Sequence, residues 1–76
     1  MNIEKVLGIL KPLSKYCRDN KIQQPIYEVD MVRNNKVWIC CHSGRFSGTA
    51  IGDIYEDVLS EAIQNFVDNF PYPYKK

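Results

Sequence analysis

The sequence predicts an α+β domain with the order α-β-β-β-α, in which two helices pack on one face of a three-stranded antiparallel sheet. Three observations predict this fold. Apolar residues recur with the helical period near both ends of the chain. Between these ends, runs rich in β-branched and aromatic residues alternate with short turn signals. Finally, each element has one apolar side, and helices packed against a sheet bury all of these sides together.

The first predicted helix begins after Asn2, whose side chain can cap it, and it continues to a polar connection at residues 20–24. Pro12 lies inside the helical pattern. Either one helix is kinked at this residue, or a second helix begins with Pro12 in its first turn. The apolar positions of this segment are Ile3, Val6, Leu7, Leu10, Leu13 and Cys17.

The middle of the chain predicts three strands joined by short turns. In residues 25–32, the side chains of Tyr27, Val29 and Met31 fall on one side and polar residues fall on the other, which is typical of a half-buried strand. The first turn contains two asparagines, which tolerate the left-handed backbone of a tight hairpin. The turns and the other two strands are assigned to residues 33–36, 37–42, 43–44 and 45–51.

The last predicted helix has a continuous apolar side and an acidic opposite side. We expect Asp53 to cap its start, with Glu56 closing a capping box, and Pro71 to end it. Its apolar residues are Ile54, Val58, Leu59, Ala62, Ile63, Phe66 and Val67. The solvent-facing side is expected to carry Asp53, Glu56, Asp57, Glu61 and Asp68.

The 76 residues fit one domain at residues 1–70, followed by a C-terminal tail at residues 71–76 that we expect to be frayed. The net charge of +1 argues against a general affinity for polyanions. Charge is unevenly distributed, because residues 1–24 carry five Lys/Arg and two acids whereas residues 51–76 carry two and five. No apolar run is long enough to span a membrane. Three cysteines without a signal segment predict reduced thiols in an intracellular protein, either cytoplasmic or nuclear.

Cys40, Cys41 and His42 are the candidates for metal binding or nucleophilic catalysis. Adjacent residues of a strand point to opposite faces, so Cys40 and Cys41 are poorly placed to share a tetrahedral metal ion. Cys41 and His42 diverge for the same reason, and no acid is evident that could orient the histidine. We therefore expect no metal site, no cofactor and no catalytic residue.

Particular residues add a family resemblance to this order of elements. Residues 13–21 (LSKYCRDNK) resemble the first helix of a double-stranded RNA-binding domain, and residues 25–29 (PIYEV) resemble the Pro-x-Tyr start of its first strand. The resemblance covers nearly the whole chain and implies a domain of this type at residues 1–70. The family pattern of the last helix, Ala-x-x-x-Ala-Ala-x-x-Ala-Leu, is filled here by Ile54, Val58, Leu59, Ala62 and Ile63.

Domains of this family bind duplex RNA through three patches, which reach two minor grooves and the major groove between them. The lysines of the third patch correspond here to Ile51, Gly52 and Tyr55, with acids beside them that repel phosphates. The second patch, a long loop between the first two strands, is replaced by the short turn at residues 33–36. In the first patch, Lys15 stands where the family offers Glu or Gln. Strong duplex RNA binding is therefore not expected.

The compact turn and the missing lysines resemble the divergent third domains of Dicer-partner proteins, in which an exposed edge strand and the last helix make homodimer or Dicer contacts. This resemblance implies a non-catalytic protein-interaction or dimerisation module in an RNA-silencing or RNA-processing assembly. Its partner is then a second copy or another protein of the RNA pathway. The third strand is either open to strand addition or short, twisted and solvated. The expected interface comprises Trp38, Arg45, Phe46, Ser47, Thr49, Ile51 and Tyr55.

Two further alternatives stay open. Trp38 is either an anchor in the core or sheet, or, if it points away from the helices, a hot spot for a protein contact. The basic side chains of the first helix and first turn are either solvated or bind duplex RNA weakly. This alternative RNA site comprises Lys11, Lys15, Arg18, Arg33 and Lys36.

Overall fold

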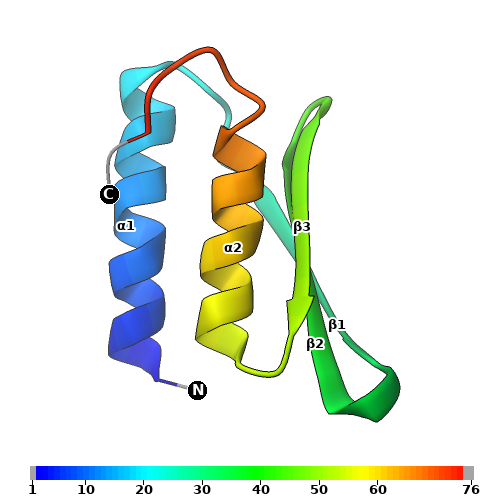
Figure 1. The fold of residues 1–76 in the computed structure, drawn as a ribbon. Coiled ribbons are helices and arrows are strands. Elements are labelled where there is room, and N and C mark those ends of the chain that lie inside the picture. Colours follow the sequence, from blue (N-terminus) through cyan, green and yellow to red (C-terminus); the bar gives the residue numbers. More distant parts are fainter. Residues whose placement is uncertain (1, 75–76) are drawn as a thin grey trace.

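A computed structural model describes residues 2–74 and confirms the α-β-β-β-α order (Figure 1). Two helices lie on one side of an open antiparallel sheet, and α2 lies between α1 and the strands in the view of Figure 1. The elements are α1 (Ile3–Asp19), β1 (Ile26–Val32), a short 3₁₀ turn (Arg33–Asn35), β2 (Lys36–Ser43), β3 (Phe46–Gly52) and α2 (Tyr55–Val67).

The strand β2 is central, with β1 and β3 as antiparallel neighbours on its two sides. In this register, Ile39 of β2 lies opposite Val29 of β1 and opposite Ala50 of β3. The alternation of buried and half-buried residues along β2 shows which face carries the helices, because every second residue is buried. The buried residues of β2 are Val37, Ile39 and Cys41.

The core lies between this face of the sheet and the two helices. The apolar side of α2 is buried as predicted, except that Ile54 precedes the helix and is exposed. Gly48 in β3 allows the close approach of α2, because a Cβ atom at this position would overlap the backbone N of Phe66 and the backbone O of Ala62. The α2 residues of the core are Val58, Leu59, Ala62, Ile63, Phe66 and Val67.

Helix α1 is a single helix that runs through Pro12, which answers the question that the sequence left open. The predicted cap at its start is confirmed, because the Asn2 side chain accepts a hydrogen bond from the backbone N of Lys5 at 3.1 Å. The C-terminal half of α1 contributes Leu13, Tyr16 and Cys17 to the core.

The turn between β1 and β2 forms as the two asparagines predict. Asn34 and Asn35 both have left-handed backbones, with φ of 63° and 59°. This turn projects away from both helices in Figure 1. The expectation of a half-buried first strand is wrong for Val29 and Met31, which are 50% and 59% exposed although they lie on the helix-bearing face, because α2 packs on β3 and β2 rather than on β1. Only Tyr27 of that side packs against the core.

The start of α2 differs from the predicted capping box. The N-cap residue is Ile54, and no side chain caps the helix. Asp53 pairs instead with the Lys36 ammonium, at 2.7 Å between Oδ1 and Nζ. Glu56, expected on the solvent-facing side, is buried and accepts a hydrogen bond of 2.7 Å from the backbone N of Asn2. The Glu56 carboxylate therefore joins α2 to the residue that caps α1, and the Asp53 carboxylate joins the segment before α2 to β2. Both contacts depend on neighbours that are distant in the sequence.

The described part of the C-terminal tail is packed against α1, so the expectation of a frayed end is wrong for Tyr72 and Tyr74. The hydroxyl of Tyr16 donates a hydrogen bond of 3.2 Å to the backbone O of Tyr72. The rings of Tyr16 and Tyr74 meet edge to face with centroids 5.2 Å apart. Residues 75 and 76 of the predicted tail lie outside the described residues.

Candidate protein-binding surface of the sheet

The strand β1 is the most exposed strand of the sheet. None of its residues is buried, and only Tyr27 is half-buried. Within residues 2–74, nine large hydrophobic side chains are exposed, and four of them lie in this one strand. They are Ile26, Val29, Met31 and Val32. Because scattered single apolar residues are normal on a surface but a whole strand of them is not, β1 is the leading candidate for a contact surface.

The face of the sheet opposite the helices carries Trp38 near its centre. Trp38 alternates with the buried residues of β2, so it points away from the helices and satisfies the condition for a contact hot spot. Its cross-strand neighbours are Asp30 in β1 and Ile51 in β3. The side chain of Ile51 is 54% exposed, so an apolar pair lies beside an acidic strand on this face.

The edge of β3, for which the sequence left strand addition as one of two alternatives, is partly covered by α2 and the residues that follow it. The side-chain amide of Asn65 donates a hydrogen bond of 2.8 Å to the backbone O of Thr49. The side-chain amide of Asn69 donates one of 2.7 Å to the backbone O of Ser47. An added strand needs these two carbonyl groups as acceptors. The two asparagines therefore act as a partial cover of this edge.

The structure brings together four of the seven residues of the predicted interface. Trp38, Ser47, Thr49 and Ile51 share the open face of the sheet.

The other three members of that set lie apart from the open face. Phe46 is half-buried against the Phe70 ring, at 4.2 Å between centroids, and the Arg45 guanidinium lies 5.3 Å from the Phe46 ring centroid. Tyr55 packs against the core at the start of α2. The predicted interface therefore divides into an open-face part and a part that holds the domain together.

Two of the five cations of the alternative RNA site form ion pairs. Lys15 binds Asp19 one turn along α1, at 2.6 Å between Nζ and Oδ2, and Lys36 binds Asp53. Within residues 2–74, Lys11, Arg18 and Arg33 form no ion pair. The basic residues of α1 are therefore only partly neutralised.

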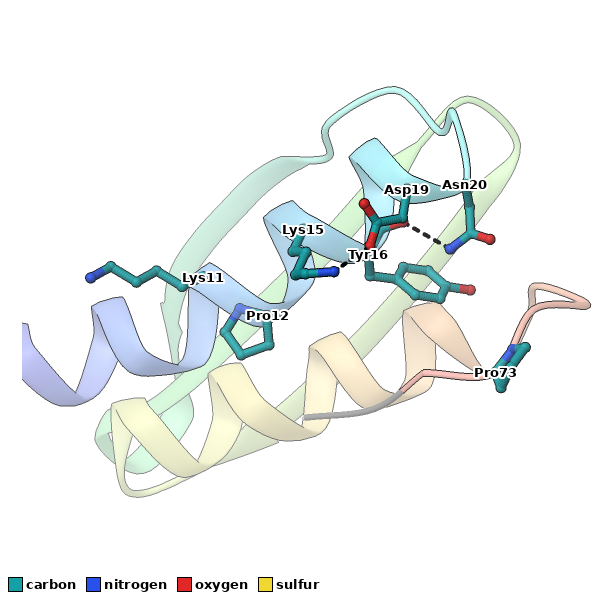
Figure 2. A pocket seen from close by; sticks show the side chains of 7 residues that line it. All are labelled: Lys11, Pro12, Lys15, Tyr16, Asp19, Asn20 and Pro73. Carbon is teal, nitrogen blue, oxygen red and sulfur yellow. Dashed lines mark hydrogen bonds and ion pairs between the residues drawn. The ribbon is translucent and has the colours of Figure 1, made fainter.

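Lys11 and Lys15 border an open hollow of about 600 Å³ between α1 and the chain end. Figure 2 shows Pro12 and Tyr16 of α1 on one side of this hollow and Pro73 of the chain end on the other. The Lys15–Asp19 pair crosses its rim (Figure 2). The hollow combines an apolar floor with one neutralised and one free lysine, so it has no strong preference for a polyanion.

The acids at the start of α2 are held by neighbouring elements. The carboxylate of Asp57 lies 3.9 Å from the Lys5 ammonium of α1. The pKa of Glu56 is lowered, first by the hydrogen bond from the backbone N–H of Asn2 and then by a backbone hydrogen bond of its own. Glu56 therefore stays ionised near neutral pH. The carboxylates of Glu56 and Asp57 are thus fixed by contacts with the start of the chain and with α1.

The cysteines lie as the alternation of the strand predicts. Cys41 and Cys17 are fully buried, whereas Cys40 is half-buried on the open face, and all three thiols are free. Burial raises the pKa of Cys41 to about 12, and burial together with the nearby Glu28 raises the pKa of Cys40. These thiols are protonated at neutral pH, which disfavours a nucleophilic role.

No group of three or more potential metal ligands forms within residues 2–74, and none of the helices in that range is long and apolar enough to cross a membrane. His42, the single histidine of the sequence, has its Nε2 atom 3.5 Å from Oε1 of Glu28. These two side chains belong to the open face beside Trp38.

Reasoning from the sequence missed two features of this surface, the exposure of β1 and the asparagine cover of β3, whereas it placed Glu28 and Asp30 correctly on the side opposite Tyr27. The spacing of Asn65 and Asn69, one helical turn apart, was the available signal for the cover. Comparison with protein-family models, curated proteins and solved structures finds no match to this chain.

Proposed function

We propose that this chain is a non-catalytic protein-interaction module of the double-stranded RNA-binding-domain type, which docks another polypeptide on its sheet. The assembly that it joins is one of RNA silencing or RNA processing, as the family resemblance implies. The observation that carries the proposal is the exposure of β1, where Ile26 and Met31 are about 60% exposed. In a domain of 76 residues, apolar surface is scarce and its burial drives folding. A strand that leaves so much of it in water is suited to burying it against a partner.

The distribution of charge supports docking over RNA binding. The start of α2 presents Asp53 and Asp57 where a duplex binder needs cations and buries Glu56 beside them, and each of these carboxylates has a partner within the domain. Neutralising them is therefore not enough to create an RNA site, because the lysines that contact phosphate are absent as well. Trp38, on the open face beside Ile51, adds the kind of aromatic anchor that protein interfaces use.

In-cell photo-crosslinking tests this function. A benzophenone amino acid replaces Met31 in β1, and a matched control places it at Glu61 on the exposed side of α2. The expected result is a protease-sensitive adduct from position 31 and little adduct from position 61. Adducts that ribonuclease removes and protease leaves as labelled RNA would overturn the proposal.

Weak duplex RNA binding is the second candidate, and one observation favours it. Lys11, Lys15 and Arg18 are spaced by four and three residues along α1, so they form one stripe, and two of them lack an ion-pair partner within residues 2–74. A binder of this kind loses affinity steeply with salt. Fluorescence anisotropy with a duplex of about 16 base pairs, at low and at physiological salt, measures it, and the K11E/R18E variant is the test of the site.

A further inference from the structure

The two edges of the sheet differ in how far they are available to another strand. In an antiparallel sheet, successive residues point their backbone N–H and C=O groups alternately toward and away from a given neighbour. The carbonyl groups of Ser47 and Thr49 accept hydrogen bonds from asparagine side chains, so they point away from β2. Their cross-strand partners, His42 and Cys40, must then point their backbone groups toward β1. The direction of the backbone N–H and C=O groups then follows for every residue of the sheet.

In β1, the partners of Cys40 and His42 are Glu28 and Ile26, whose backbone groups therefore point inward. Tyr27, Val29 and Met31 point theirs outward, along the free edge. The local geometry agrees, because the outward N–H of Met31 is bonded at 2.8 Å to the carboxylate Oδ1 of Asp30.

The other outward groups, those of Tyr27 and Val29, have no hydrogen-bond partner within residues 2–74. No residue of β1 is proline, and among residues 2–74 no element covers this edge as α2 covers that of β3. The edge of β1 is therefore the more open of the two.

The side chains along this edge define what can add to it. On the helix-bearing side, Val29 and Met31 are exposed and apolar, because α2 packs on β3 and β2 and leaves these two residues of β1 uncovered. On the open side, Glu28 and Asp30 present two exposed carboxylates two residues apart. The helix-bearing side of the strand thus offers an apolar row, whereas the open side offers an acidic pair between the exposed apolar residues Ile26 and Val32.

We propose that β1 is the docking edge of this domain and that it pairs with an extended segment of a partner polypeptide. That segment carries Lys or Arg at alternate positions, facing Glu28 and Asp30, and apolar residues between them, covering Val29 and Met31. The inference rests on the proposed protein-docking function and specifies its site and the chemistry of its partner. Main-chain hydrogen bonds supply the pairing, and the two rows of side chains supply the selectivity.

A second copy of this chain is a poor occupant of the same edge. Antiparallel pairing about Val29 sets Glu28 of each copy opposite Asp30 of the other, so four carboxylates meet on one face. A shift of two residues in either direction places Glu28 opposite Glu28 or Asp30 opposite Asp30. Like charges directly opposite each other destabilise a strand pair. Charge complementarity therefore selects a basic partner and disfavours self-pairing.

The charge-reversed variant E28K/D30K provides a probe of the stated chemistry. Its β1 strand has cations at the two acidic positions and keeps the apolar residues between them, so it is complementary to the native strand. Sedimentation equilibrium at up to millimolar concentration is measured for the native protein, for the variant and for an equimolar mixture. The expected result is a 1:1 heterodimer in the mixture, about tenfold or more tighter than either self-association, because opposite-charge pairs replace like-charge pairs.

Two further variants complete the test. V29P removes an outward N–H at the centre of the edge without removing a ladder hydrogen bond, so it should abolish the heterodimer while the fold, followed by circular dichroism, persists. E28Q/D30N removes the repulsion and should self-associate more strongly than the native chain. A matched control reverses Glu4 and Glu61, which lie away from β1, and should not pair with the native protein.

The outcomes separate this inference from the function on which it rests. A mixture that stays monomeric, or a heterodimer that tolerates V29P, overturns the β1 edge as the docking site. If amide chemical shifts in the mixture map to the Trp38 face or to β3 instead, the edge is overturned while protein docking stands. If in-cell crosslinking at Met31 yields RNA adducts, the proposed function itself fails, whatever the variants do.

Discussion

Replacing Gly48 with alanine should destabilise the domain strongly, because α2 lies directly against this residue. The added Cβ would overlap the backbone N of Phe66 and O of Ala62 and would lie 2.7 Å from the backbone C of Asn65. All three atoms belong to the backbone of α2, so no side-chain rotation can relieve the overlap. Overpacking typically costs about 1–3 kcal/mol, and a rigid backbone places this case near the upper end, at about 3 kcal/mol.

This magnitude is large against the total. A domain of 76 residues has a free energy of unfolding of about 4–11 kcal/mol. With a urea m-value of about 1 kcal/mol/M, the midpoint of unfolding should fall by about 3 M. Urea titration followed by far-ultraviolet circular dichroism measures the shift. The two helices supply the signal, so the loss of α2 packing is observed directly.

Gly8→Ala is the matched control for this measurement. Gly8 lies within α1, and a Cβ added there meets no atom within 4 Å. The control should stabilise the protein by about 0.5–1 kcal/mol, because alanine restricts the unfolded chain and favours the helix. A Gly48→Ala protein whose midpoint stays within about 0.5 M of the native value would refute the close approach of α2 to β3.

Three further predictions address the cysteine thiols, the carboxylate of Glu56 and the asparagine side chains that cover the edge of β3. Cys40 should react with iodoacetamide well before the two buried cysteines, and mass spectrometry of partially labelled protein measures the three rates. Equal rates would contradict the assigned faces of β2. Glu56 has a lowered pKa in the folded state, so its contribution to stability is present above its ordinary pKa of 4.5 and is lost as the pH falls through the lowered value. Glu56→Gln should therefore reduce the melting temperature more at pH 7 than at pH 3, and an equal reduction at both would argue against the contact with Asn2. The double variant Asn65→Ala with Asn69→Ala should keep the fold but lose two hydrogen bonds, which lowers the free energy of unfolding by about 1–2 kcal/mol. It should also self-associate more strongly through β3, as light scattering would measure. An unchanged mass in solution would show that the asparagines do not protect this edge.

The proposed docking mode gives a physical role to the unequal edges of the sheet. An open edge is a hazard, because any strand with a suitable sequence can add to it. At β3 the hazard is reduced by Asn65 and Asn69, which take up two outward carbonyl groups. At β1 the acidic pair Glu28 and Asp30 opposes self-pairing but leaves the edge accessible to a basic strand. Covering one edge and charging the other would combine solubility with selective docking.

The sequence by itself determined the order of the elements, because that order depends on local periodicity. The apolar residues of α2 recur at the helical spacing, and all of those within the helix are buried as predicted. The left-handed backbones of Asn34 and Asn35 follow from the tolerance of asparagine for that conformation. The opposite faces of Cys40 and Cys41 follow from the pleat of a strand.

Only the tertiary structure decided which surfaces stay in water and which polar groups find partners. Val29 and Met31 have the pattern of a buried row, but α2 packs on β3 and β2 and leaves them uncovered. Asp53 and Glu56 have the spacing of a capping box, but Lys36 and the backbone of Asn2 bind them instead. Periodicity reports the side of an element on which a residue lies, whereas exposure and pairing depend on neighbours distant in the chain, which local pattern does not encode.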